Sequence, residues 1–128
     1  MNLLLDTHTF LWFVSDDQRL SEATKALIEA DDSQPFLSIA SVWEMAIKVS
    51  LGKLKLDEPF EIFIPQQLAM NGTGILNISL EHTAAISTLP FHHRDPFDRL
   101  IAVQARLEKM PLVSADPAFD AYEVQRVW

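Results

Sequence analysis

The sequence of 128 residues has no cysteine and no long hydrophobic run. Without cysteine, a disulfide framework and a thiolate zinc site are both excluded. No apolar stretch approaches the roughly 18 residues that a membrane-spanning helix needs. The apolar run Leu3–Leu5 is too short for a signal peptide and lacks its basic flank. We therefore expect a protein of the cytoplasm that does not enter a membrane.

Basic residues are also scarce: ten Lys and Arg stand against 18 Asp and Glu, for a net charge of −8. This balance argues against a generic nucleic-acid-binding module, whose affinity comes from neutralising phosphates. It remains compatible with an enzyme that gathers acidic side chains around a divalent metal ion. With 48% hydrophobic residues, the length suffices for a real core, and we expect one domain spanning residues 1–128.

Short apolar runs alternate with segments of helical periodicity along the chain. Strands are predicted at residues 1–6, 36–39, 74–78 and 112–116, with a weak edge strand at 122–128. Helices are predicted at residues 10–14, 21–30, 41–52, 57–70 (in two pieces around Pro65), 79–88 and 95–109. This alternation predicts an α/β fold with a central parallel sheet flanked by helices.

The stretch from His92 to Ala105 contains the most informative acidic residues. Asp95 followed by Pro96 predicts a helix start, because the carboxylate caps free N–H groups and proline fits the first helical position. Asp98 heads an apolar stripe of that helix. A carboxylate on such a face is costly unless a cation or a hydrogen-bond donor meets it. A favourable interaction with the helix dipole is the alternative explanation of Asp98.

Three other acidic residues are predicted to meet Asp98. Asp6 and Asp116 each end a predicted strand, and ligands of parallel sheets bind beyond the carboxyl ends of the strands. Glu44 lies in the first turn of a predicted helix. Each acid also has a local explanation, since Asp6 and Asp116 can cap helices and Ser41 with Glu44 has the spacing of a capping box.

Four acids at one edge favour a shared site over four separate caps. Crowded carboxylates raise one another's pKa unless a cation keeps them ionised. Oxygen ligands without cysteine select a hard ion, so the pattern indicates Mg²⁺ or Mn²⁺.

The chain resembles the PIN domain family, and within it the VapC-type toxin ribonucleases of type II toxin–antitoxin pairs. The resemblance spans nearly the whole chain and depends on four short motifs in order, at residues 3–8, 41–44, 93–99 and 112–116. It implies a three-layer, Rossmann-like PIN fold with a central parallel sheet. It also implies a metal-dependent endoribonuclease in which metal-activated water hydrolyses an RNA phosphodiester bond.

The resemblance assigns roles to individual residues. Asp6 and Asp98 match the most direct metal ligands, and Glu44 and Asp116 match the acids that complete or support the metal site. These four are the expected catalytic residues.

Three further residues are expected to support this site. Thr7 and Ser114 match small hydroxyl positions that orient ligands or water. Asp95 is a fifth acid for which three roles stay open: an N-cap, which we favour, a group that hydrogen-bonds to a metal ligand, or a ligand of a second ion.

Basic side chains near the acids are candidates for contact with RNA phosphate. Arg94 and Arg99 have the guanidinium geometry that matches phosphate, and we expect Arg99 on the outward side of its helix. His93 is a further candidate. Lys48, Lys53 and Lys55 form a basic cluster that either covers a solvated surface or touches phosphates near the site. The expected substrate is single-stranded or loop RNA, since the acidic surface offers little footprint for a duplex.

The resemblance also implies a homodimer and a separate antitoxin protein. Trp12, Phe13 and Trp43 are candidate interface anchors, with core packing as the alternative. Two other functions stay open. The first is a catalytically silent PIN-fold module that binds RNA or protein. A receiver-like phosphoacceptor domain is less favoured, because Asp6 has no paired acid and no lysine follows residues 112–116.

Overall fold

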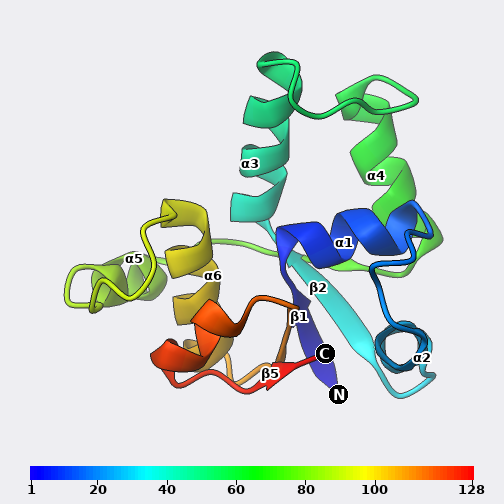
Figure 1. The fold of residues 1–128 in the computed structure, drawn as a ribbon. Coiled ribbons are helices and arrows are strands. Elements are labelled where there is room, and N and C mark those ends of the chain that lie inside the picture. The colour runs from blue at the N-terminus through cyan, green and yellow to red at the C-terminus, as the bar shows by residue number, and fades with distance from the viewer.

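The computed structural model describes residues 1–128 and shows a five-stranded sheet between two layers of helices (Figure 1). The strands are β1 (Asn2–Leu5), β2 (Gln34–Ser38), β3 (Gly74–Leu76), β4 (Leu112–Val113) and β5 (Arg126–Val127). Their order is β3-β2-β1-β4-β5, and every neighbouring pair is parallel. The predicted α/β architecture with a central parallel sheet is therefore confirmed.

The helices divide between the two faces of the sheet. They are α1 (Thr7–Val14), α2 (Glu22–Glu29), α3 (Ile39–Ser50), α4 (Phe60–Met70), α5 (Leu80–Ile86), α6 (Pro96–Leu107) and the 3-10 helix η1 (Pro117–Tyr122). Helices α1 to α4 contribute to one hydrophobic cluster, and α6 and η1 contribute to the other, with α5 packed against it. No helix is both long enough and apolar enough to cross a membrane.

Strand β1 joins the two clusters through its alternating side chains. Leu3 and Leu5 pack into the first cluster, and Leu4 packs into the second. All three leucines are fully buried. A continuous apolar run is what a strand covered on both faces requires, because successive side chains point to opposite faces.

The order of the strands determines where the acidic residues meet. From β1 the chain adds β2 and β3 on one side and β4 and β5 on the other. The switch point of the sheet therefore lies between β1 and β4, where open α/β sheets form a crevice beyond the strand ends. Leu5 of β1 is in register with Val113 of β4. Asp6 and Asp116 therefore lie just beyond the ends of two adjacent strands, at the same edge of the sheet.

Several predicted details of the helices are wrong. Helix α1 begins at Thr7 and not at residue 10, and α4 begins at Phe60 and not at residue 57. Helix α3 begins directly at the end of β2, where the Ser38 side chain accepts the N–H of Ala40 at 3.0 Å. Ser41 lies inside this helix, so the predicted capping box of Ser41 and Glu44 does not form. Helix α4 continues through Pro65 as one element. Glu61, whose carbonyl loses its helical partner at Pro65, is exposed and accessible to water.

Candidate metal-binding active site

Asp6 follows β1 and has both carboxylate oxygens held by hydrogen bonds. The backbone N–H of Thr9 donates to Oδ1 at 2.7 Å, which makes Asp6 the N-cap of α1. The hydroxyl of Ser114, which follows β4, donates to Oδ2. Asp6 is buried. The capping explanation of Asp6 is therefore correct, and the cap also fixes the carboxylate at the switch point of the sheet.

Glu44 enters the site from α3, where it is buried. Because α3 begins at Ile39, Glu44 lies in the second turn and not in the first turn as predicted. The hydroxyl of Thr7 donates to its Oε1 at 2.8 Å, and Lys48 Nζ lies 3.0 Å from its Oε2. Thr7 Oγ1 is also 2.8 Å from the hydroxyl oxygen of Ser41. Thr7 thus orients Glu44 across 37 positions of sequence. The predicted supporting role of Thr7 fits this geometry.

Asp95 caps α6, as its sequence position predicts. Its Oδ1 accepts the backbone N–H groups of Phe97 and Asp98 at 2.8 and 3.1 Å. Pro96 occupies the first turn, as expected. Among the three roles left open for Asp95, the N-cap is the one for which the structure provides hydrogen bonds.

Asp98 lies in the first turn of α6 and has a strongly perturbed carboxyl group. Burial and the neighbouring Asp95 raise the pKa of Asp98 to about 7, with His93 lowering it in part. The carboxylates of Glu44 and Asp6 contribute smaller upward shifts to the same value. The perturbation shows that these acids share one electrostatic environment.

His93 lies between two of the acids. Its Nδ1 accepts the backbone N–H of Asp95 at 3.1 Å, so the neutral ring carries its proton on Nε2. Nε2 is 3.1 Å from Asp98 Oδ2 and 3.4 Å from Asp116 Oδ2. The backbone N–H of His93 donates to the hydroxyl of Tyr122 at 2.6 Å. Sequence reasoning missed Tyr122, because no local pattern connects residues 29 positions apart.

Asp116 caps η1 and completes the group of acids. Its Oδ1 accepts the N–H of Ala118 at 2.9 Å, while Oδ2 points toward His93. The backbone N–H of Asp116 donates to Ser114 Oγ at 3.0 Å. Ser114 therefore links Asp6 to Asp116 through a single hydroxyl.

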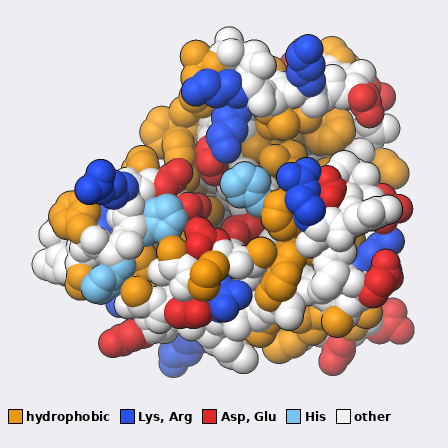
Figure 2. All heavy atoms as spheres, in the orientation of Figure 1, with side chains coloured by type: hydrophobic (Ala, Val, Ile, Leu, Met, Phe, Trp, Pro, Cys, Tyr) orange, Lys and Arg blue, Asp and Glu red, His pale blue; other side chains and the backbone are white.

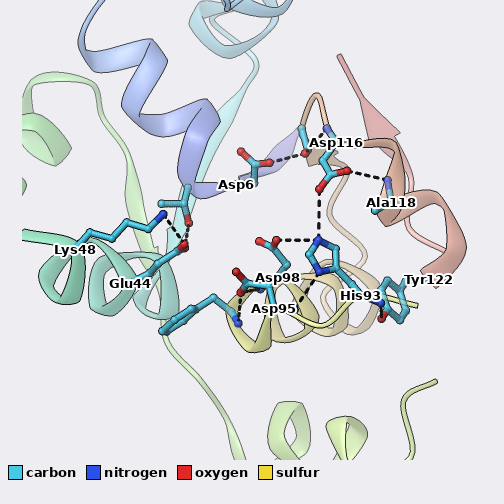
Figure 3. A network of polar contacts seen from close by, with 12 residues as sticks. Asp6, Glu44, Lys48, His93, Asp95, Asp98, Asp116, Ala118 and Tyr122 are labelled. Carbon is cyan, nitrogen blue, oxygen red and sulfur yellow. Dashed lines mark hydrogen bonds and ion pairs between the residues drawn. The ribbon is translucent and has the colours of Figure 1, made fainter. Parts of the chain in front are cut away.

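The four predicted acids surround a common space, which Figure 3 shows with Asp6, Glu44, Asp98 and Asp116 entering from different elements. One candidate ligand atom each from His93, Asp98 and Asp116 lies within 4.8 Å of the others. A cavity of about 170 Å³ opens beside Asp6 and Asp116.

The donor set of this space fits a hard divalent cation. Carboxylate oxygens predominate, and sulfur donors are absent. Burial is the largest cause of the raised pKa of Asp98, and the neighbouring carboxylates of Asp95, Glu44 and Asp6 add to it. Lys48 and His93 each contact part of this group from its edge.

Arg99 does not face outward, so this expectation is wrong. Its guanidinium is buried and donates to the carbonyl oxygens of Pro90 at 2.9 Å and Leu89 at 3.2 Å. It also lies 4.0 Å from the ring centroid of Phe91. Arg99 thus anchors the loop before α6, because that loop folds back over the helix start. Arg94 is exposed and stays available to solvent.

Comparison with known proteins places the chain in a family. Residues 3–125 match the model of the PIN domain. Over 61 residues the chain is 38% identical to Ribonuclease VapC16 of Mycobacterium tuberculosis. That match covers 48% of this chain and 43% of the relative, so it spans less than half of the relative's length.

Two solved structures share the fold over almost the whole chain. One is VapBC2 from Rickettsia felis, bound to a DNA fragment from its promoter, with a TM-score of 0.75 and 17% sequence identity. The match covers 99% of this chain and 98% of that one. A toxin–antitoxin complex from Klebsiella pneumoniae has a TM-score of 0.64 at 24% identity, with 98% of this chain and 96% of that one. The fold predicted from the sequence is confirmed, and the chain belongs to the PIN domain family.

Proposed function

We propose that this protein is a metal-dependent endoribonuclease and the toxin component of a type II toxin–antitoxin pair. The observation that carries the proposal is the convergence of Asp6, Glu44, Asp98 and Asp116 at one edge of the sheet (Figure 3). Membership of the PIN domain family and the partial similarity to Ribonuclease VapC16 support it.

Mg²⁺ or Mn²⁺ is the proposed cofactor, held directly by Asp6 and Asp98. Glu44 and Asp116 complete the site from α3 and from the start of η1. When bound, such an ion supplies positive charge that acidifies water and neutralises the scissile phosphate. Ionised carboxylates are required for this binding, so Asp98 must lose its proton as the ion enters.

The surrounding residues keep the acids in place for this chemistry. Ser114 and the N–H of Thr9 hold the two oxygens of Asp6, which prevents the carboxylate from rotating. Thr7 and Lys48 hold Glu44 in the same way. Because these partners are in place before substrate arrives, little reorganisation is needed during the reaction.

Contact with the RNA phosphates is proposed for Arg94 and His93. Arg94 is exposed beside the acids, and its guanidinium can bind phosphate oxygens in pairs. His93 carries an Nε2 proton that already faces the carboxylates. We retain Arg99 as a residue that positions the loop, since its donors are occupied.

A homodimer and a cognate antitoxin are the proposed protein partners, and the cytoplasm is the proposed location. The fold is shared with VapBC2 and with a further toxin–antitoxin complex. Trp43 is 61% exposed and packs edge-on against Phe97 at 5.2 Å, so it offers an apolar anchor for an interface. Trp12 and Phe13 instead pack against the core of this protein.

Cleavage of structured and unstructured RNA by the purified protein tests the proposal. Reactions with Mn²⁺, Mg²⁺ or EDTA are compared for the wild type, Asp98→Asn and a matched control, Asp31→Asn, at an exposed acid outside the site. We expect cutting that requires metal and is lost in Asp98→Asn alone. If Asp98→Asn keeps both RNA cleavage and metal binding, the assignment of the site is refuted. Absence of both in the wild type would favour the silent binding module.

A further inference from the structure

A groove of about 520 Å³ opens beside the acidic site, between α1 and the loop that follows α3. His8 and Trp12 line this groove and also line the small cavity that contains Asp6 and Asp116. The groove therefore adjoins the site. Figure 2 shows Lys and Arg side chains gathered along this hollowed face, next to histidine and the carboxylates.

Positive charge is concentrated in this groove. Lys48, Lys53 and Lys55 line it, which is three of the five lysines in a chain of net charge −8. Lys53 and Lys55 are exposed, and no carboxylate lies within ion-pair distance of either. The lining contains two acids, of which Asp17 is paired with Arg19 at 2.7 Å. Asp57 is then the one acid in the lining that can offset the charge of the lysines.

Local structure holds these lysines at the groove. Gly52 has a φ of +71°, a left-handed conformation that reverses the chain at the end of α3. The N–H groups of Lys53 and Leu54 then donate to the carbonyl oxygen of Lys48 at 2.8 and 3.2 Å. Leu54 packs against the core. The loop is thus anchored at Leu54, and the lysines on both sides of it line the groove.

We propose that this lysine groove (Lys48, Lys53 and Lys55 with His8 and Trp12) binds the part of a single-stranded RNA that flanks the bond held at the acidic site. The inference rests on the proposed function and adds a substrate subsite to it. The proposed ion neutralises only the scissile phosphate, so attraction for the flanking phosphates has to come from a neighbouring surface. Lysine ammonium groups supply such attraction to phosphates.

The aromatic side chains at the junction suit a nucleotide base. His8 is exposed, and its ring lies 5.9 Å from that of Trp12. Flat rings beside positive charge are the usual combination for single-stranded nucleic acid, because every base has a face that can stack. The groove adjoins the acids, and this favours RNA over a protein, since a strand whose phosphate lies at the acids reaches the groove within a few nucleotides.

Paired lysine variants test the groove against a control of equal charge change. Lys53→Gln/Lys55→Gln removes the two unpaired lysines, and Lys25→Gln/Lys109→Gln removes two lysines outside the groove. Binding of a labelled single-stranded RNA is measured with Ca²⁺ over a range of salt concentrations. Cleavage is measured on a short RNA that covers only the acidic site and on a longer RNA.

For the groove variant we expect roughly tenfold weaker binding of the longer RNA and a salt slope shallower by about 1.4, at about 0.7 for each lost phosphate contact. Its KM for the longer RNA rises while kcat and cleavage of the short RNA stay at wild-type values. The control variant stays within about twofold of wild type. His8→Ala weakens binding of the longer RNA, and His8→Phe restores it.

Three outcomes would overturn the inference. In the first, the groove variant and the control variant bind and cut the longer RNA equally well. In the second, the groove variant cuts the short RNA and the longer RNA with the same loss of activity. In the third, the groove variant retains RNA binding but loses its complex with the antitoxin, which assigns the groove to a protein. If wild type cuts RNA and the lysine variants behave alike, the subsite fails and the proposed function stands. If wild type cuts no RNA, the function fails, and the binding titration still decides on the groove.

Discussion

His93 Nε2 lies 3.1 Å from Asp98 Oδ2, and this contact places a hydrogen-bond donor beside the most perturbed acid of the site. The backbone N–H of Asp95 occupies the other ring nitrogen, so the neutral His93 presents its proton to Asp98. This donor offsets only part of the crowding, because the pKa of Asp98 remains about 7. Burial and the nearby carboxylates therefore outweigh the effect of His93 on this carboxyl group.

Asp98→Asn is expected to abolish RNA cleavage, by at least about 100-fold, while the metal-free protein becomes more stable at pH 8. The substitution removes a carboxylate that is ionised among other acids at that pH. The side chain of Asp98 is 23% exposed, so solvent screens part of the repulsion. We therefore expect the free energy of unfolding to rise by about 1 kcal/mol, which corresponds to roughly 4 °C in Tm. Thermal unfolding of the wild type and the variant in EDTA at pH 8 and pH 5 measures this difference in stability. An equal shift at both pH values would contradict the electrostatic cause.

Metal binding is expected to tighten as pH rises through about 7. The folded protein holds a proton on Asp98 up to that pH, whereas the unfolded chain releases it near the ordinary value of 3.8. Between these two values the stability of the metal-free protein therefore falls as pH rises. Below pH 7 the ion displaces the proton. Calorimetric titration with Mn²⁺ in buffers of different ionisation enthalpy counts the protons released, and a release of zero protons at pH 6 would contradict this prediction.

Ser114→Ala is expected to lower cleavage about tenfold and to cost about 1 kcal/mol of stability. The Ser114 hydroxyl donates to the Asp6 carboxylate and accepts the backbone N–H of Asp116, so its loss frees one carboxylate and loosens the backbone that carries another. Cleavage rates and urea unfolding measure the effects. Ser87→Ala is the control, since that hydroxyl contacts only a carbonyl on an exposed helix end.

Arg94 and Arg99 are expected to differ in what their loss changes. Arg99→Lys destabilises the fold by about 1–2 kcal/mol, because one ammonium cannot replace the two carbonyl contacts and the stacking on Phe91. Arg94→Gln leaves Tm unchanged and raises KM for RNA severalfold. Unfolding curves and steady-state cleavage of both variants separate the two effects. A lower Tm in Arg94→Gln would contradict the assignment of Arg94 to the substrate.

Local signals in the sequence predicted the strands and three of the caps. The run Leu3–Leu5 forms a buried strand because an apolar segment covered on both faces needs no alternation. Asp6, Asp95 and Asp116 cap helices through bonds to N–H groups two or three residues ahead. Such contacts depend on spacing alone, so a sequence pattern can predict them.

The boundary and direction errors have physical causes that a local pattern does not contain. Ser38 and Ser41 are both competent caps, and the end of β2 selected Ser38. Arg99 turns inward because the loop at Leu89 and Pro90 offers carbonyl oxygens there. Each choice depends on chain segments that meet only after folding.

The sequence by itself determined the alternation of strands and helices and the acids placed at strand ends and helix starts, since these follow from periodicity and short-range hydrogen bonds. Only the tertiary structure decided which groups hold those acids. Thr7 reaches Glu44, Ser114 reaches Asp6, and His93 reaches Asp98 and Asp116. Except for His93 with Asp98, these partners are far apart in the chain. Packing of helices on a parallel sheet brings them together, because both faces of the sheet must be covered.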